Sequence, residues 1–117
     1  MSYKPGLHIL SEFESVKEGV FISSVDSKIL FDSLITLYGL AKVGEVYHDF
    51  EGGGFTAVIC LTESHLSIHT WPEYQLATFD IFLSNYQKDN HEKVRAIYQE
   101  VLHFFEGVER QKTEIIR

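Results

Sequence analysis

The sequence predicts an α+β fold, a two-layer sandwich in which an antiparallel sheet carries two helices on one face. Two observations support this prediction. Five or six segments have strand character, and two longer segments each have one apolar stripe at helical spacing. The length of 117 residues and the hydrophobic content of 44% suit one domain, 1–117, with an ordinary core.

The first half of the chain predicts a strand, a helix and a second strand. Residues 7–13 form a short apolar segment that predicts the first strand. A helix follows, with Asp26 or Ser27 as its cap and an end before Gly44. Its apolar stripe is formed by Leu30, Leu34, Leu37, Tyr38 and Ala41. Residues 43–50 predict the next strand.

Three consecutive glycines, 52–54, close this strand and permit positive φ angles and close approach of the backbone to a neighbour. A phosphate-binding loop is disfavoured, because no Gly-Lys-Ser or Gly-Lys-Thr ending follows and the next segment is a strand rather than a helix. A hairpin turn is the simpler interpretation.

The second half predicts further strands and one helix. The expected strands are 55–62, 65–70, 76–83 and a loosely alternating tail, 108–116, that suits a sheet edge. After a polar connection, 85–90, Asp89 or Asn90 caps a helix that ends at Gly107. The amphipathic stripe of this helix is formed by Val94, Ile97, Tyr98, Val101, Leu102 and Phe105.

Composition excludes several classes of partner and site. The 17 acidic residues outnumber the 10 basic ones, and the resulting net charge of −7 argues against nucleic acid or an anionic membrane as partner. The single cysteine, Cys60, allows no intrachain disulfide, and we expect it to be a small buried residue of its strand. No apolar run approaches the ~18 residues of a membrane span, and no signal peptide is evident, so we expect a cytoplasmic protein.

The most unusual stretch is 61–74, which places a hydroxyl, two imidazoles and two carboxylates within a short distance along the chain. Leu66 and Ile68 alternate with the polar residues His65, Ser67 and His69, which predicts a strand with one apolar and one polar face. Pro72 should end this strand at Trp71. His65 and His69 would be about 13 Å apart on a strand, so we expect no metal site there.

The run Glu63-Ser64-His65, followed by Ser67-Ile68-His69-Thr70-Trp71-Pro72-Glu73, resembles the self-processing segment of prokaryotic S-adenosylmethionine decarboxylases. The resemblance extends weakly back to Gly6-Leu7-His8-Ile9-Leu10 and forward through Asp80-Ile81-Phe82, so it covers most of the chain. It implies the same α+β fold, a homodimer, and a glycine turn that lies beside the processing site. An uncovered sheet face would also need a partner on physical grounds.

The resemblance implies that Ser64 attacks the carbonyl of Glu63, and that elimination then leaves two chains, 1–63 and 64–117, the second of which begins with a pyruvoyl group. Thr56 and His69 stand at the positions of the family's hydroxyl helper and processing histidine. The pyruvoyl carbonyl can form a Schiff base with a substrate amine and accept the electrons released by decarboxylation. No external cofactor or metal is then required.

The resemblance also implies substrate contacts. Glu73 would bind the ribose hydroxyls, Phe50 would stack on adenine, and Trp71 would line the site. The family usually has a cysteine proton donor where this chain has Ser84, and an alkyl hydroxyl is a far weaker acid than a thiol with a pKa of ~8.5. A water or His69 would donate the proton instead, or the substrate has changed, or the reaction has been lost.

The expected function is decarboxylation of S-adenosylmethionine to the aminopropyl donor of spermidine synthesis. One alternative within the same chemistry is a pyruvoyl-dependent ornithine or arginine decarboxylase, which would need an acidic pocket instead of an adenine slot. Another is an uncleaved, non-catalytic homologue that binds or regulates a partner. The remaining histidines, His8, His48, His91 and His103, form no evident constellation in the sequence.

Overall fold

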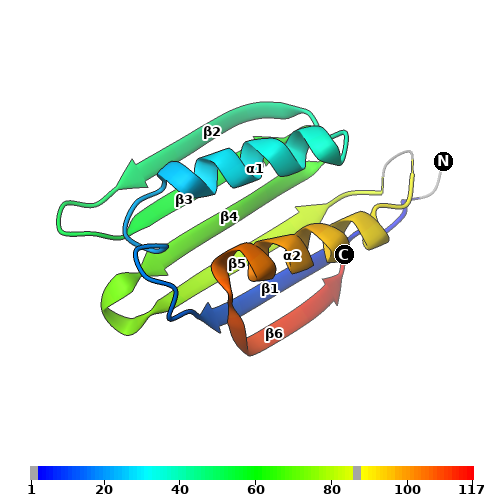
Figure 1. Ribbon diagram of the computed structural model, residues 1–117. Coiled ribbons are helices and arrows are strands. Elements are labelled where there is room, and N and C mark those ends of the chain that lie inside the picture. Colours follow the sequence, from blue (N-terminus) through cyan, green and yellow to red (C-terminus); the bar gives the residue numbers. More distant parts are fainter. Residues whose placement is uncertain (1–2, 86–87) are drawn as a thin grey trace.

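The computed structural model describes residues 3–85 and 88–117 as a six-stranded antiparallel sheet with two α-helices (Figure 1). The elements are β1 (Leu7–Glu14), α1 (Val25–Leu37), β2 (Lys42–Asp49), β3 (Phe55–Leu61), β4 (Ser64–Trp71), the short 3₁₀ helix η1 (Pro72–Tyr74), β5 (Leu76–Leu83), α2 (His91–Phe105) and β6 (Val108–Ile116). The strand order is β2-β3-β4-β5-β1-β6. Each predicted strand agrees with the structure to within one residue at either end.

Both helices lie on the same face of the sheet, so the predicted two-layer α+β sandwich is confirmed (Figure 1). Alternate residues of the four inner strands point to this face and are buried, as in the run Phe55, Ala57, Ile59 and Leu61 of β3. A stack of aromatic rings joins the layers, with the ring centroids of Phe31 and Phe79 6.2 Å apart and those of Phe79 and Tyr98 6.3 Å apart.

The predicted limits of α1 are wrong, and its predicted stripe is confirmed only for Leu34, which is buried, and for Leu30 and Tyr38, which pack at the edge of the core. The N-cap residue is Ser24, which the carboxylate of Asp49 holds through both its backbone N–H and its hydroxyl, so neither Asp26 nor Ser27 caps the helix. Gly39, with a φ of +67°, follows the last turn and ends α1 well before Gly44. The buried residues are Ser27, Phe31, Leu34 and Ile35, whereas Leu37 is exposed.

The prediction for α2 is largely confirmed. Its buried residues are Val94, Ile97, Tyr98, Val101 and Phe105, and Leu102 packs at the edge of the same core. Asn90 occupies the N-cap position, but the first backbone N–H of the helix, that of His91, donates its hydrogen bond to the Asp89 carboxylate. The backbone N–H of Gly107 donates a hydrogen bond to the carbonyl oxygen of Leu102, and this contact ends the helix. The polar connection 85–90 lies partly outside the described residues.

Cys60 is exposed, contrary to the expectation that it is buried. The core-facing residues of β3 are the odd-numbered ones, so Cys60 belongs to the opposite face, together with Thr56 and Val58. We call this opposite face the open face, because neither helix covers it. Among the described residues, no helix is long and apolar enough to cross a membrane.

The open face is a mixture of exposed apolar side chains and a polar centre. Exposed apolar residues from five strands lie on it, among them Leu10, Val46, Val58, Trp71 and Ile115. A hollow of about 460 Å³ lies between β1, β5 and β6, and Glu12, Thr78 and Asp80 are among the residues that line it. This face therefore offers both a surface for burial and titratable groups.

Candidate active site

The Glu63–Ser64 peptide bond lies where the tight turn between β3 and β4 enters the strand. Thr62 and Glu63 form the turn, and Ser64 is the first residue of β4. Ser64 has a φ of +146°, a conformation that side chains other than glycine rarely adopt. Such a residue stores backbone strain of about 1–3 kcal/mol, and strain of this kind concentrates at functional sites.

The carbonyl of this same peptide bond is held from the neighbouring strand. The backbone N–H of Ser84 donates to the carbonyl oxygen of Glu63 at 2.7 Å. Ser84 is fixed in turn by the buried Asn90, whose side-chain Nδ2 donates to the Ser84 carbonyl at 2.7 Å. A fixed N–H donor on a carbonyl is the arrangement that stabilises negative charge when the carbonyl carbon is attacked.

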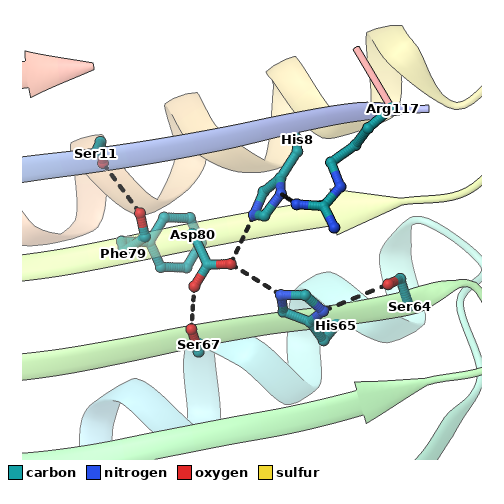
Figure 2. Close-up of polar contacts among 8 residues, drawn as sticks. All are labelled: His8, Ser11, Ser64, His65, Ser67, Phe79, Asp80 and Arg117. Carbon is teal, nitrogen blue, oxygen red and sulfur yellow. Dashed lines mark hydrogen bonds and ion pairs between the residues drawn. The ribbon is translucent and has the colours of Figure 1, made fainter. Parts of the chain in front are cut away.

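Three strands bring two histidines and an aspartate together on the open face beside Ser64 (Figure 2). Asp80 Oδ2 lies 2.8 Å from the Nε2 of His8 on β1 and 2.8 Å from the Nε2 of His65 on β4. The hydroxyl of Ser67 donates to the other oxygen, Asp80 Oδ1. On the far side of its ring, His65 Nδ1 lies 3.4 Å from the hydroxyl of Ser64.

Asp80 is ionised at neutral pH in this setting. Burial by itself would raise the pKa of Asp80, but the hydrogen bonds from Ser67, His8 and His65 outweigh it and hold that pKa below its ordinary value. The carboxylate is therefore a fixed negative charge that accepts three hydrogen bonds, and it orients both imidazole rings.

The atoms His8 Nε2, His65 Nε2 and Asp80 Oδ2 all lie within 4.8 Å of one another, so they offer three ligand atoms to a metal ion. The two contacts of 2.8 Å have the length of N–H···O hydrogen bonds, which satisfy the carboxylate oxygen without an ion. His69 is not a member of this group, and it lies four residues from His65 along β4, about 13 Å at strand spacing.

His69 and Thr56, the predicted processing pair, contact each other across β4 and β3, and the Thr56 hydroxyl bonds to His69 Nδ1. They do not contact Ser64. His69 is five residues further along β4, about 17 Å at strand spacing. Within one chain the structure thus separates the pair from the serine that it was expected to serve.

The predicted substrate-binding residues lie still further from Ser64. Trp71 ends β4, about 23 Å from Ser64 at strand spacing, and Glu73 follows in η1. Phe50 follows β2 at this same end of the sheet and packs edge-on against His48. All three side chains are exposed.

The glycine turn also lies at this distant end, so within one chain it is not beside Ser64, as the resemblance implied. Gly52, Gly53 and Gly54 do have positive φ angles, and they form the predicted hairpin turn between β2 and β3. The close neighbour of Gly54 is Pro72 of η1, whose Cδ would lie 3.1 Å from an added Cβ atom. The turn supports the Trp71–Glu73 segment rather than Ser64.

Comparison with known proteins decides the family. The S-adenosylmethionine decarboxylase family model matches residues 7–117. The chain belongs to the S-adenosylmethionine decarboxylase family. The match confirms the resemblance drawn from residues 63–73, and it includes all six strands of the sheet.

Individual members of the S-adenosylmethionine decarboxylase family are similar to this chain in sequence and in structure. The S-adenosylmethionine decarboxylase proenzyme of Archaeoglobus fulgidus is 40% identical over 77 residues, which are 66% of this chain and 69% of that protein. The proenzyme of Aquifex aeolicus is 39% identical over 77 residues, 66% of this chain, and this segment spans only 57% of its length. The crystal structure of adenosylmethionine decarboxylase from Aquifex aeolicus superposes with a TM-score of 0.79 at 26% identity, covering 99% of this chain and 91% of that one.

Sequence reasoning missed the contribution of His8 and Asp80 to the site. His8 is 72 residues before Asp80, and only the antiparallel register of β1 with β5 brings them together. Both have even numbers, whereas the core residues of these two strands have odd numbers. Pairing 7–13 with 76–83 on that alternation would have placed both side chains on one face.

Proposed function

We propose that this chain is the precursor of a pyruvoyl-dependent decarboxylase that converts S-adenosylmethionine to the aminopropyl donor of spermidine synthesis. The observation that carries the proposal is the Glu63–Ser64 junction. Its serine has a strained backbone, and its carbonyl oxygen already accepts a hydrogen bond from the Ser84 N–H. Family membership supports the same reaction.

Self-processing is proposed to begin when the Ser64 hydroxyl oxygen bonds to the carbonyl carbon of Glu63. The carbon–nitrogen bond breaks, the nitrogen gains the hydroxyl proton, and an ester joins the two parts of the chain. Removal of the Ser64 α-proton then expels the Glu63 carboxylate. This elimination frees chain 1–63 and leaves a dehydroalanine at position 64. Water then hydrolyses the imine form of the dehydroalanine, which releases ammonia and leaves a pyruvoyl group.

The residues present fit this group, because Ser64 is its precursor and its hydroxyl lies beside His65, whose other ring nitrogen contacts the Asp80 carboxylate. The pyruvoyl carbonyl would supply an electron sink for decarboxylation. Glu73, Phe50 and Trp71 are proposed to bind the ribose and adenine of the substrate. Ser84 is proposed to lie beside the reacting carbon, because its N–H holds the Glu63 carbonyl.

A complete site is proposed to require two copies of the chain. Ser64 and Ser84 lie at one end of the sheet, whereas Phe50, Trp71 and Glu73 lie at the other end. Pairing two open faces about an axis that crosses the strands would bring the Ser64 end of one copy against the Glu73 end of the other. The same pairing would bury the exposed apolar residues of the open face.

The negative charge argues against nucleic acid or an anionic membrane as partner. A small-molecule substrate and a cytoplasmic location are the remaining parts of this proposal. The −7 charge would also suit the cationic sulfonium of S-adenosylmethionine. The position of Glu73 beside exposed aromatic rings favours a nucleoside over ornithine or arginine.

The test is the mass of freshly purified protein under denaturing conditions, with Ser64→Ala as the matched control. We expect two fragments from the parent, 1–63 and a 64–117 chain without a free amine, and one intact chain from the control. Release of carbon dioxide is then measured with S-adenosylmethionine, ornithine and arginine. Cleavage with turnover of only ornithine or arginine would show that one of these, and not S-adenosylmethionine, is the substrate. An intact parent chain would overturn the proposed enzyme in favour of a binding or regulatory protein.

A further inference from the structure

We propose that His65, oriented by Asp80 and His8, is the base that takes the hydroxyl proton of Ser64 in the first step of self-processing. This inference rests on the proposed function and adds to it a catalytic residue and two positioning residues. It assigns the two histidines of β4 to different steps, with His65 acting on the hydroxyl and His69 on the α-proton.

The hydrogen bonds determine which nitrogen of His65 is free. An ionised carboxylate only accepts hydrogen bonds, so the contact between Asp80 Oδ2 and His65 Nε2 places the ring proton on Nε2. In the neutral ring, Nδ1 then carries the lone pair. This atom lies 3.4 Å from the Ser64 hydroxyl and can accept its proton (Figure 2).

His8 reinforces this arrangement from the neighbouring strand. The guanidinium of Arg117 only donates hydrogen bonds, and its contact with His8 Nδ1 at 3.5 Å makes that nitrogen an acceptor. His8 therefore donates from Nε2 to Asp80 Oδ2, the same oxygen that receives His65. Donors thus face the carboxylate from β1 and from β4, and Asp80 cannot turn away from His65 without breaking them.

No other described side chain is hydrogen-bonded to the Ser64 hydroxyl in residues 3–85 and 88–117. His69 engages Thr56 and is separated from Ser64 by about 17 Å of strand in the same chain. The positive φ of Ser64 accompanies the contact, because successive side chains of a regular strand point to opposite faces and would not meet.

The proposed step balances without any added reactant. The Ser64 hydroxyl proton moves to His65 Nδ1 as the oxygen bonds to the Glu63 carbonyl carbon, and the negative charge on the carbonyl oxygen faces the Ser84 N–H. His65 then returns the proton to the departing nitrogen of residue 64. The carbon–nitrogen bond breaks, an ester forms, and His65 is neutral again.

The experiment separates ester formation from elimination in His65→Gln, His69→Gln and the unaltered chain. Each precursor is sampled over time, denatured, and treated with hydroxylamine, which cleaves an ester at position 64 and leaves the amide intact. We expect His65→Gln to form total cleavable product at least about 100-fold more slowly than the unaltered chain, as for loss of a general base. His69→Gln should accumulate the ester.

A truncated variant, His65→Ala, supplies a readout that a purely structural role would not move. Added imidazole should restore its ester formation, because the small base can occupy the vacated space, and the same addition should not accelerate Ser64→Ala. Asp80→Asn should slow ester formation and respond less to imidazole. His103→Gln, which alters an exposed histidine of α2, is the matched control and should process at the parental rate.

Circular dichroism and thermal unfolding of each precursor establish that the variants are folded. A folded His65→Gln that forms the ester at the parental rate would overturn this inference while the proposed function stands. If the unaltered chain is never cleaved, both fall together. The time course of the unaltered chain is also run with and without a chelator. Cleavage that stops when the chelator is added would replace the proton transfer by a metal on the two imidazoles and also overturn the inference.

Discussion

The backbone N–H of Ser84 donates a 2.7 Å hydrogen bond to the carbonyl oxygen of Glu63. The donor belongs to the main chain, so the exchange of the family's usual cysteine for serine leaves it in place. Two roles at this position are thereby separated. The N–H is proposed to act in self-processing, and the side chain only afterwards, in protonation of the product.

Substitutions at Ser84 should therefore affect turnover and not cleavage. We expect Ser84→Cys and Ser84→Ala to be cleaved at the parental rate, measured by mass over time. Ser84→Cys should raise turnover of S-adenosylmethionine, because a thiol of pKa ~8.5 gives up a proton far more readily than a hydroxyl. Equal turnover and equal enzyme lifetime in parent and Ser84→Cys would show that the side chain is not the proton donor.

Two inactive variants should complement each other if the site is shared between copies. In a mixed dimer of Ser64→Ala and His69→Gln chains, one site has both defects and the other has an intact Ser64 and an intact His69. We expect co-expression to yield cleaved His69→Gln chain, identified by its mass, whereas neither variant is cleaved alone. If verified mixed dimers are not cleaved, Ser64 and His69 must act together within one chain.

The stability contributed by Asp80 should depend on pH in a defined direction. Its pKa is lowered in the folded protein, so its stabilising contribution is present above the ordinary aspartate pKa of about 3.9 and is lost as the pH falls through the folded value. In the uncleaved Ser64→Ala background, Asp80→Asn should lower the unfolding free energy at pH 7. The deficit should shrink below about pH 4.

Urea unfolding at a series of pH values measures this effect, and Glu18→Gln, at an exposed position, is the control. The deficit of the control should be small and should not follow the same course. A constant deficit of Asp80→Asn from neutral to acid pH would contradict the assignment of a lowered pKa to this carboxyl group.

Phe79 should be a large contributor to stability, because its ring packs between Phe31 of α1 and Tyr98 of α2. Phe79→Ala should cost about 3–5 kcal/mol in urea unfolding of the Ser64→Ala background. Leu37→Ala, at an exposed position of α1, should change the unfolding free energy by less than about 0.5 kcal/mol. A similar loss in both variants would contradict the placement of the core.

Periodicity predicted most of the fold, because alternation and helical spacing report directly on burial. The stripe of α2 was read correctly since the exposed residues of this helix are polar or charged, whereas α1 also exposes apolar residues such as Ile29 and Leu37. The apolar spacing of α1 therefore does not tell Leu37 from Phe31, and only packing shows that Phe31 is buried and Leu37 exposed. Gly39 was the available signal for the end of α1.

The site was predicted only in part, because local sequence carries no information on distance across a sheet. The run 63–73 appears as one motif, but an extended strand places Ser64 and Glu73 at opposite ends. His8 and Asp80 contribute from strands far apart in the sequence and needed the register. Cys60 was misplaced because β3 is apolar on both faces, so alternation alone did not decide its orientation.

The strand order gives the proposed cut a further consequence, which concerns the folding history of the molecule. Strand β4 lies between β3 and β5, and β1 lies between β5 and β6, so chains 1–63 and 64–117 are interleaved through three ladders. The precursor folds as one molecule, but the cleaved protein can reassemble after unfolding only by a second-order encounter of two fragments. The yield of refolded cleaved protein should depend on protein concentration. The turn between β3 and β4 therefore assists folding only in the precursor, before the cut removes it.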